Sequence, residues 1–207
     1  RTAACGFTDL LIAPLFAATD DPFLVSSHHE GCADLSWDVP FATGLRHLCT
    51  AAGEQGIGIL LDLPLDRIAR DGALARQHPA WCLHDDGTRA ARWDFPAHHH
   101  DILQYWAGIV QMLLDAGVAG FRCDAPQDVP PAMLHDIIRI SHRITPTCRW
   151  IAWTAGLSAD LVRQVALTGV NMVASSIAWW NRRGPWFEEE WARRAPGGGG
   201  GASPRGV

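Results

Sequence analysis

Apolar residues along this chain follow two alternating patterns. Some segments are continuous apolar runs that end near a charge or a proline, as in "IGILLDLP" at 57–64. Others space their apolar residues three or four apart, as with Leu45, Leu48 and Ala52. A continuous run is typical of a strand buried on both faces, and the wider spacing is typical of a helix with one buried face. We therefore predict strands at 7–16, 57–64, 118–126, 148–156 and 170–180, and helices at 41–56, 101–117, 129–144 and 158–169.

The predicted strands and helices alternate, which favours an α/β fold with a parallel sheet between helices. Two architectures have this order, a doubly wound open sheet and a (β/α)8 barrel. The first strand is not followed by the GxGxxG turn of a dinucleotide-binding doubly wound sheet. A complete barrel takes about 250 residues, and only about five strands are found here. We therefore expect residues 1–194 to form an incomplete (β/α)8 barrel, followed by a flexible glycine-rich tail at 195–207.

The composition narrows the possible partners and the compartment. With 207 residues, 48% of them hydrophobic, the chain is globular and can bury a sizeable core. Its net charge of -5 offers no basic stripe, so we expect no nucleic acid partner. The longest apolar run, at 10–18, is shorter than the roughly 20 residues of a membrane span. The six cysteines form no CxxC pair, so we expect free thiols in a reducing, cytoplasmic compartment.

The strand "GVAGFRCDAP" at 117–126 ends on two opposite charges, Arg122 and Asp124. Side chains alternate along a strand, so these two share one face, at the carboxyl end where barrel enzymes keep their chemistry. A guanidinium beside a carboxylate lowers the pKa of that carboxylate and keeps it ionised. A fixed, ionised carboxylate is the nucleophile of a retaining glycosidase. The alternative is a salt bridge that only fills the mouth of the barrel.

Several stretches together resemble the α-amylase family, glycoside hydrolase family 13. "GVAGFRCDAP" is similar to the nucleophile strand of that family, whose pattern is G-F-R-x-D-A. "GIGILLDLPLDR" resembles the third barrel strand of the family and "CGFTDLLIAPLF" the second, so the chain would supply about strands two to six. The resemblance covers roughly residues 5 to 192 and is greatest to the branch that transfers maltosyl units from maltose 1-phosphate to α-glucan.

The resemblance implies a role for each of four residues. Asp124 would be the nucleophile, Arg122 would keep it charged and oriented, and Asp62 would support the base of the site. Arg67 stands where the family has a histidine that touches substrate. This chemistry needs no metal and no organic cofactor. The implied ligands are an α-glucan or malto-oligosaccharide, with maltose 1-phosphate as a candidate donor, and the sequence does not predict an oligomeric state.

Aromatic side chains can also bind sugars, because their faces suit sugar rings. We expect most of the ten tryptophans to be core residues. Trp179 and Trp180 end a predicted strand at the catalytic face, and we take Trp179 as the stacking candidate.

The chain departs from the family pattern at catalytically important positions. Trp153 stands where the family has the glutamate that acts as general acid, and an indole cannot transfer a proton at neutral pH. Asp66 and Arg67 replace an Asn-His pair, and the aspartate of the seventh strand has no counterpart. Three interpretations remain: an α-glucan-acting enzyme fragment of little or no activity, a degenerate glucan-binding or scaffolding barrel, and an unrelated α/β protein.

Two histidine-rich stretches, "HHE" at 28–30 and "HHHD" at 98–101, invite a metal site. Adjacent histidines on a loop rarely converge on one ion, and no HExxH spacing is present, so we expect no metal. We expect 94–101 to be a polar loop before the helix that leads to the fourth strand, and "WDFP" at 93–96 to line the sugar cleft or form a surface turn.

Overall fold

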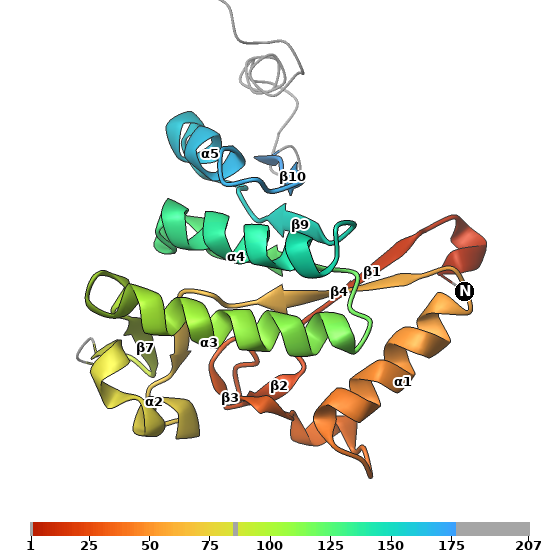
Figure 1. Cartoon of the computed structure of the whole chain (residues 1–207), viewed down its shortest axis with the longest axis horizontal. Helices are drawn as coiled ribbons and strands as arrows, with labels where there is room; N and C mark the ends of the chain where they lie inside the picture. Colours follow the sequence, from red (N-terminus) through yellow and green to blue (C-terminus); the bar gives the residue numbers. More distant parts are fainter. Residues whose placement is uncertain (1, 85–86, 177–207) are drawn as a thin grey trace, which may run out of the picture.

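The computed structural model describes residues 2–84 and 87–176. Its centre is a sheet of five strands that pair in parallel throughout (Figure 1). The order across the sheet is β1 (Asp9–Ile12), β4 (Gly58–Leu63), β8 (Gly120–Cys123), β9 (Arg149–Ala152) and β10 (Met172–Val173). Each lies inside a strand predicted from the sequence, and the order in space follows the order in the chain.

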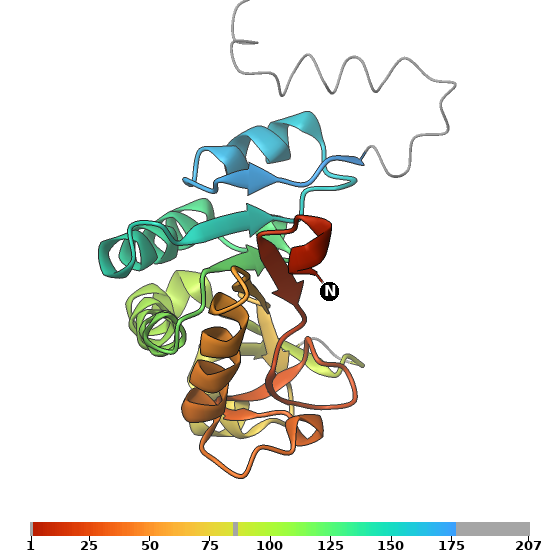
Figure 2. The ribbon, with the colours of Figure 1, turned by 90° about the vertical axis from the view of Figure 1, so that its right-hand side faces the viewer.

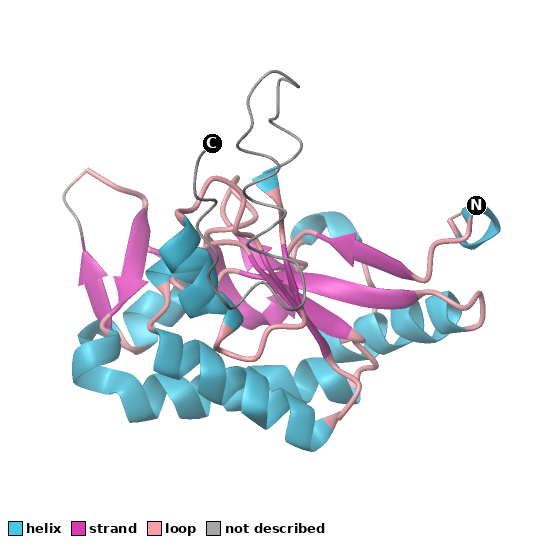
Figure 3. Cartoon of the chain, turned by 90° about the horizontal axis from the view of Figure 1, so that it is seen from above, coloured by secondary structure: helices cyan, strands magenta, loops and turns pink. Residues whose placement is uncertain are grey.

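Helices connect the successive strands of this sheet, as they do in a (β/α)8 barrel. They are α1 (Phe41–Gly53), α3 (Phe95–Asp115), α4 (Pro131–Ile144) and α5 (Ala159–Ala166). The helices α1, α3 and α4 lie along one side of the sheet (Figure 2). The view from above shows the longest helices along one side of the strands (Figure 3). Strands with helices on their outer side form the wall of an incomplete barrel, as the sequence predicts.

Two small antiparallel sheets interrupt this regular alternation, and the sequence did not predict them. The first, between β1 and α1, pairs β2 (Phe16–Ala18) with β3 (Val25–Gly31). The second lies between β4 and α3 and has the order β5-β7-β6. Its elements are β5 (Arg67–Ala69), the short helix α2 (Ala73–Gln77), β6 (Cys82–His84) and β7 (Ala90–Trp93). These two inserted segments, called excursions below, bring residues from outside the barrel wall toward the carboxyl ends of its strands.

The helix α3 begins earlier than the sequence predicted. We expected 94–101 to be a polar loop, whereas the helix starts at Phe95 and the side chain of Asp94 accepts a hydrogen bond from the Ala97 amide. An aspartate cap followed by Pro96 in the first turn is a helix start signal that the run of histidines obscured. The backbone departs from helical geometry only at His98, with φ -126° and ψ 31°.

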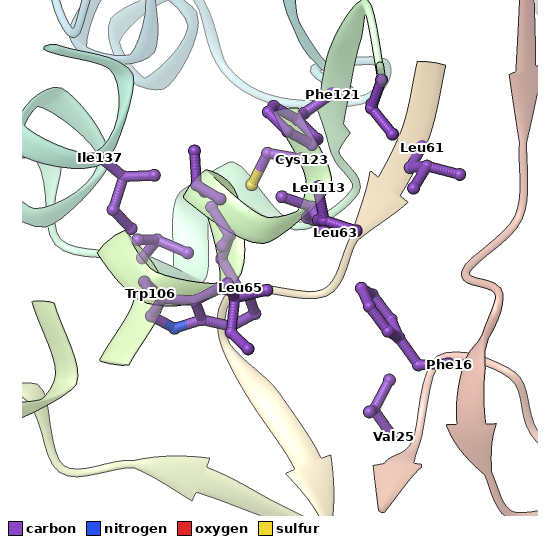
Figure 4. Close-up of a cluster of buried hydrophobic side chains, with 14 of the residues drawn as sticks. Phe16, Val25, Leu61, Leu63, Leu65, Trp106, Leu113, Phe121, Cys123 and Ile137 are labelled. Carbon is purple, nitrogen blue, oxygen red and sulfur yellow. The ribbon is translucent and has the colours of Figure 1, made fainter. Parts of the chain in front are cut away.

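A single apolar core lies between the sheet and the helices (Figure 4). Phe121 and Leu61 from the sheet meet Leu113 and Ile137 from α3 and α4, and all four are buried. The core also includes Phe16 of β2. The carboxyl ends of β4 and β8, where the charged residues lie, are therefore anchored by this core.

In the described ranges, no helix combines the length and the apolarity that crossing a membrane requires. The predicted tail at 195–207 and the boundary at 194 lie outside the described residues.

Candidate functional site

The carboxyl ends of β4 and β8 carry a forked ion pair. The strand register sets Asp62 opposite Arg122, and Arg122 donates from Nε to Oδ1 at 2.5 Å and from Nη2 to Oδ2 at 2.7 Å. Asp62 is only 2% exposed. Burial raises the pKa of the Asp62 carboxyl above its ordinary value, and the hydrogen bonds and charge of Arg122 oppose that rise.

The sequence interpretation that paired Arg122 with Asp124 is therefore wrong. The two residues are two positions apart on one strand, a spacing of about 6.6 Å, whereas neighbouring strands lie about 4.8 Å apart. Asp62 is the closer partner for this reason, and the Arg122 guanidinium donates two hydrogen bonds to it.

Asp124 follows β8 directly and pairs with a residue from the excursion after β4. Its Oδ2 accepts a hydrogen bond from Nη2 of Arg67 at 2.6 Å. Its Oδ1 is buried and has no hydrogen-bond partner among the described residues. The other arm of Arg67, Nη1, donates to Oδ1 of Asp66 at 2.6 Å. One guanidinium therefore bridges two carboxylates.

Asp66 is the second buried carboxyl of the site, at 5% exposed. Burial is the main reason that its pKa rises to about 6, and the negative charges of Asp124 and Asp128 add to the rise while Arg67 opposes it. Burial on its own lowers the pKa of Arg67, but Asp66 and Asp124 outweigh that effect, so the net shift is upward. Arg67 therefore stays charged near neutral pH.

Trp153 lies at the carboxyl end of β9, next to this network. Its amide donates to the Cys123 carbonyl at 2.9 Å, which fixes its backbone to β8. Its ring lies 5.4 Å from the guanidinium carbon of Arg122, a cation–π contact, and the residue is 43% exposed. An open indole face thus stands at the position where the resemblance implies the general acid.

Other residues singled out from the sequence lie elsewhere. His28 is fully buried in β3, where its Nδ1 lies 2.7 Å from the Tyr105 hydroxyl and Trp106 packs edge-on against its ring. His98 to His100 lie on α3. Across residues 2–84 and 87–176, no three His, Cys, Asp or Glu side chains group closely enough to hold a metal ion. Trp179 falls outside the described residues.

One residue of the site, Phe23, and one contact, between Arg67 and Asp124, could not be predicted from the sequence. Phe23 lies between β2 and β3, and its ring centroid is 5.8 Å from the guanidinium carbon of Arg67. The contact between Arg67 and Asp124 joins residues 57 positions apart. Both depend on how the two excursions fold over the strand ends, which local patterns do not reveal.

The described site can hold a carboxylate nucleophile but offers no free acid. Asp124 is fixed at one oxygen and unpartnered at the other. Of the nearby carboxyls, Asp62 and Asp66 are each bonded to an arginine, and Asp128 accepts a hydrogen bond from Gln127. This arrangement suits attack on an electrophilic carbon better than protonation of a leaving group.

Comparison with curated proteins finds relatives in one class of enzyme, although no family model matches the chain. An alpha-1,4-glucan:maltose-1-phosphate maltosyltransferase of Burkholderia pseudomallei (strain K96243) is 28% identical over 207 residues. A protein of the same name from Bifidobacterium longum (strain NCC 2705) is 25% identical over 214 residues. The matches cover 92% and 88% of this chain but only 18% and 28% of the relatives. The chain thus spans less than a third of their length.

Solved structures give the fold. An α-amylase from Lactobacillus plantarum superposes with a TM-score of 0.68 at 18% identity, over 89% of this chain and 47% of its own. An α-amylase from Geobacillus thermoleovorans reaches a TM-score of 0.70 at 10% identity, over 84% of this chain and 42% of its own. This chain has the α-amylase fold. The α-amylase resemblance found in the sequence is confirmed, and so is the expected incomplete barrel.

Proposed function

We propose that this chain is part of an α-amylase-type barrel that acts on α-glucans by a retaining mechanism, with Asp124 as the nucleophile. The observation that carries the proposal is the state of Asp124 at the carboxyl end of β8: its side chain is 17% exposed, and one of its oxygens is held by a guanidinium. The names of the curated relatives support maltosyl transfer to an α-glucan, with maltose 1-phosphate as donor.

In the proposed reaction, the carboxylate of Asp124, whose side chain is 17% exposed, attacks the anomeric carbon while the bond to the leaving group breaks. The leaving group departs with the bonding electron pair, and a glycosyl ester of Asp124 forms. A hydroxyl oxygen of the acceptor then attacks the same carbon, gives its proton to solvent and returns the carboxylate. The two inversions together retain the anomeric configuration.

The leaving group decides how fast the first step runs. Trp153 cannot supply a proton, and loss of a general acid costs about 10²–10⁴-fold. Phosphate and fluoride leave with little or no protonation. We therefore propose that the site favours an anionic donor such as maltose 1-phosphate over an ordinary glycoside. The six cysteines, all free thiols, suit a reducing cytoplasmic location.

The test uses α-maltosyl fluoride, a donor that needs no acid, with the full chain. We expect fluoride release and a maltosyl ester on Asp124, detected by mass spectrometry of the peptide. Asp124→Asn should slow release by about 10²-fold or more, because an amide is a poor nucleophile. The control is Asp160→Asn, which changes an exposed carboxylate on α5. Equal release by wild type and Asp124→Asn would refute the nucleophile assignment.

A non-catalytic glucan-binding barrel is the second candidate, and Trp153 in place of an acid favours it. In that case calorimetric titration with maltoheptaose gives binding, Trp153→Ala weakens it, and Asp124→Asn leaves it unchanged. No donor, including the fluoride, is turned over. Binding together with fluoride release that depends on Asp124 would reject this candidate.

A further inference from the structure

The guanidinium that serves Asp124 comes from a different element from the one the sequence indicates. We propose that Arg67 is the positioning residue of Asp124, that Asp66 holds Arg67 in place for this role, and that Arg122 serves Asp62 instead. The functional meaning of this assignment rests on the proposed function, because it takes Asp124 as the nucleophile. The pairing itself can be tested without any sugar chemistry.

Arg67 is fixed at three points. Its Nη2 donates to Asp124 and its Nη1 to Asp66, both at 2.6 Å, and Phe23 lies 5.8 Å from its guanidinium carbon. A guanidinium is planar and rigid, so holding one nitrogen fixes the direction of the other. The side chain of Asp66 is only 6% exposed, which makes it a firm anchor. Arg67 is thus aimed at Asp124 by a group that solvent scarcely reaches.

Arg122 is already bound to Asp62 and is not available to hold Asp124. Its Nε and Nη2 both donate to Asp62, whose side chain is 3% exposed, and Trp153 lies against its guanidinium. Breaking this fork would leave Asp62 buried and unpaired, a costly state. The forked pair is therefore the stable partnership of Arg122, and Arg67 is the guanidinium left for Asp124.

The contact with Arg67 fixes the orientation of the Asp124 carboxylate. Oδ2 accepts from Arg67, and Oδ1 is buried without a partner among the described residues. Two of the five N–H donors of Arg67 are engaged with carboxylates, so its contact with substrate, which the resemblance implied, stays a prediction for the remaining donors.

Site-directed chemical labelling can test the pairing. A water-soluble carbodiimide activates a protonated carboxyl, and glycine ethyl ester then displaces the urea to form an amide, which peptide mass spectrometry locates. A carboxyl whose oxygen is covered by a guanidinium reacts slowly. Arg67→Met keeps the bulk of the side chain and removes its charge. We expect it to speed labelling of Asp124 roughly tenfold, since a hydrogen bond to a charged group is worth about that factor.

The matched variant is Arg122→Met, which should leave the labelling of Asp124 close to the wild-type rate. A third variant, Phe23→Ala, opens space beside Arg67 without removing charge and should leave Asp124 slow. Faster labelling of Asp124 in Arg122→Met but not in Arg67→Met would overturn the proposal. If circular dichroism shows that a Met variant is unfolded, the neutral variants Arg67→Gln and Arg122→Gln replace it, with the same expected order for Asp124.

The pH profile of labelling supplies a second readout. Asp66 faces Arg67, Asp124 and Asp128, and its pKa is about 6, raised mainly by burial. Below that pH Asp66 is neutral, and the charge of Arg67 is left to Asp124. In Asp66→Asn this change near pH 6 should vanish from the Asp124 profile, whereas an unchanged profile would contradict the anchoring role.

Glycosylation by α-maltosyl fluoride separates this proposal from the proposed function. If Arg67 positions the nucleophile, Arg67→Met should slow ester formation on Asp124 about tenfold or more, with a smaller effect on maltoheptaose binding. Chemical labelling that follows the expected order, together with no reaction of wild type with the fluoride, would refute the proposed function and uphold the pairing. Reaction of the wild type with the fluoride, together with chemical labelling that does not follow the expected order, would refute the pairing and leave the proposed function standing.

Discussion

His28 is a buried histidine among aromatic rings. Its Nδ1 lies 2.7 Å from the Tyr105 hydroxyl, and Nε2 has no partner among the described residues. Burial, followed by the charge of His29, lowers the pKa of His28 from 6.5 to about 3. The folded chain thus keeps this ring neutral at a pH where the unfolded chain protonates it.

We predict from this that folding stability falls as the pH drops from about 6.5 toward 3. At pH 5 the loss from His28 is about 2 kcal/mol relative to pH 7. Urea unfolding at both pH values would measure it, with His28→Gln as the comparison, because glutamine can still bond Tyr105 but does not titrate. Asp66 has the opposite effect on stability. Because its pKa is raised to about 6, it stabilises the folded chain as the pH falls through that value, equally in the wild type and in His28→Gln. Equal pH dependence of the two proteins would contradict the prediction.

Trp153 is the other residue whose replacement is informative. We predict that Trp153→Glu speeds turnover of ordinary malto-oligosaccharide donors by about 10²-fold, because it restores an acid at the end of β9. The same variant should not speed reaction with α-maltosyl fluoride, which needs no proton. Trp153→Gln has the same shape as the glutamate variant and no proton to give, so similar gains in both would show that the effect is not acid catalysis. Product analysis by chromatography would measure the rates.

Among the elements, β8 and β9 approach one another unusually closely at Gly120. A Cβ atom at this position would lie 2.3 Å from the Arg149 carbonyl oxygen, so only glycine fits without moving the strands. Gly120→Ala should destabilise the chain by about 2–3 kcal/mol, a typical cost of overpacking. Gly108→Ala in α3 is the control, because nothing lies within 4 Å of its Cβ position and alanine favours helices. Thermal unfolding of both variants would test this, and equal midpoints would contradict it.

The central elements could be predicted from sequence because burial on both faces leaves a continuous apolar run. The strand β4 is buried along nearly its whole length and was evident for that reason. The strands β5, β6 and β7 span only three or four residues each, and their pairings, such as Cys82 with Trp93, join distant positions. No local pattern marks such strands, so the excursion that carries Arg67 was missed.

The contrast between continuous apolar runs and pairings without a local pattern also explains which parts of the site could be predicted. Asp62, Arg122 and Asp124 follow or end apolar strands, and their common location could be inferred from strand direction alone. Their pairing could not, because it depends on strand register and on Arg67 arriving from β5. The sequence therefore located the charged groups and left their partners undetermined.

At the scale of the whole molecule, the central sheet has two edges in the described part of the chain. β1 pairs only with β4, and β10 pairs only with β9. Leu10 on β1 is 41% exposed. An apolar strand with unpaired backbone groups favours edge-to-edge association.

We predict that the full 207-residue chain self-associates with rising concentration and that Leu10→Lys reduces this association. The control is Leu83→Lys, which changes a leucine of similar exposure, 48%, on β6 in a separate sheet. Sedimentation velocity over a range of concentrations would compare the three proteins. Equal association of wild type and Leu10→Lys would rule out this edge as the contact.

The excursion at 64–94 leaves the carboxyl end of β4 and returns at the start of α3. It contributes nothing to the wall of the barrel, yet it delivers Arg67 to a residue on β8. A graft that exchanged this one segment between relatives would therefore also exchange the charge beside the reactive carboxylate, with the wall left intact. The charge beside Asp124 is thus set by a segment that is separate from the strands of the barrel wall.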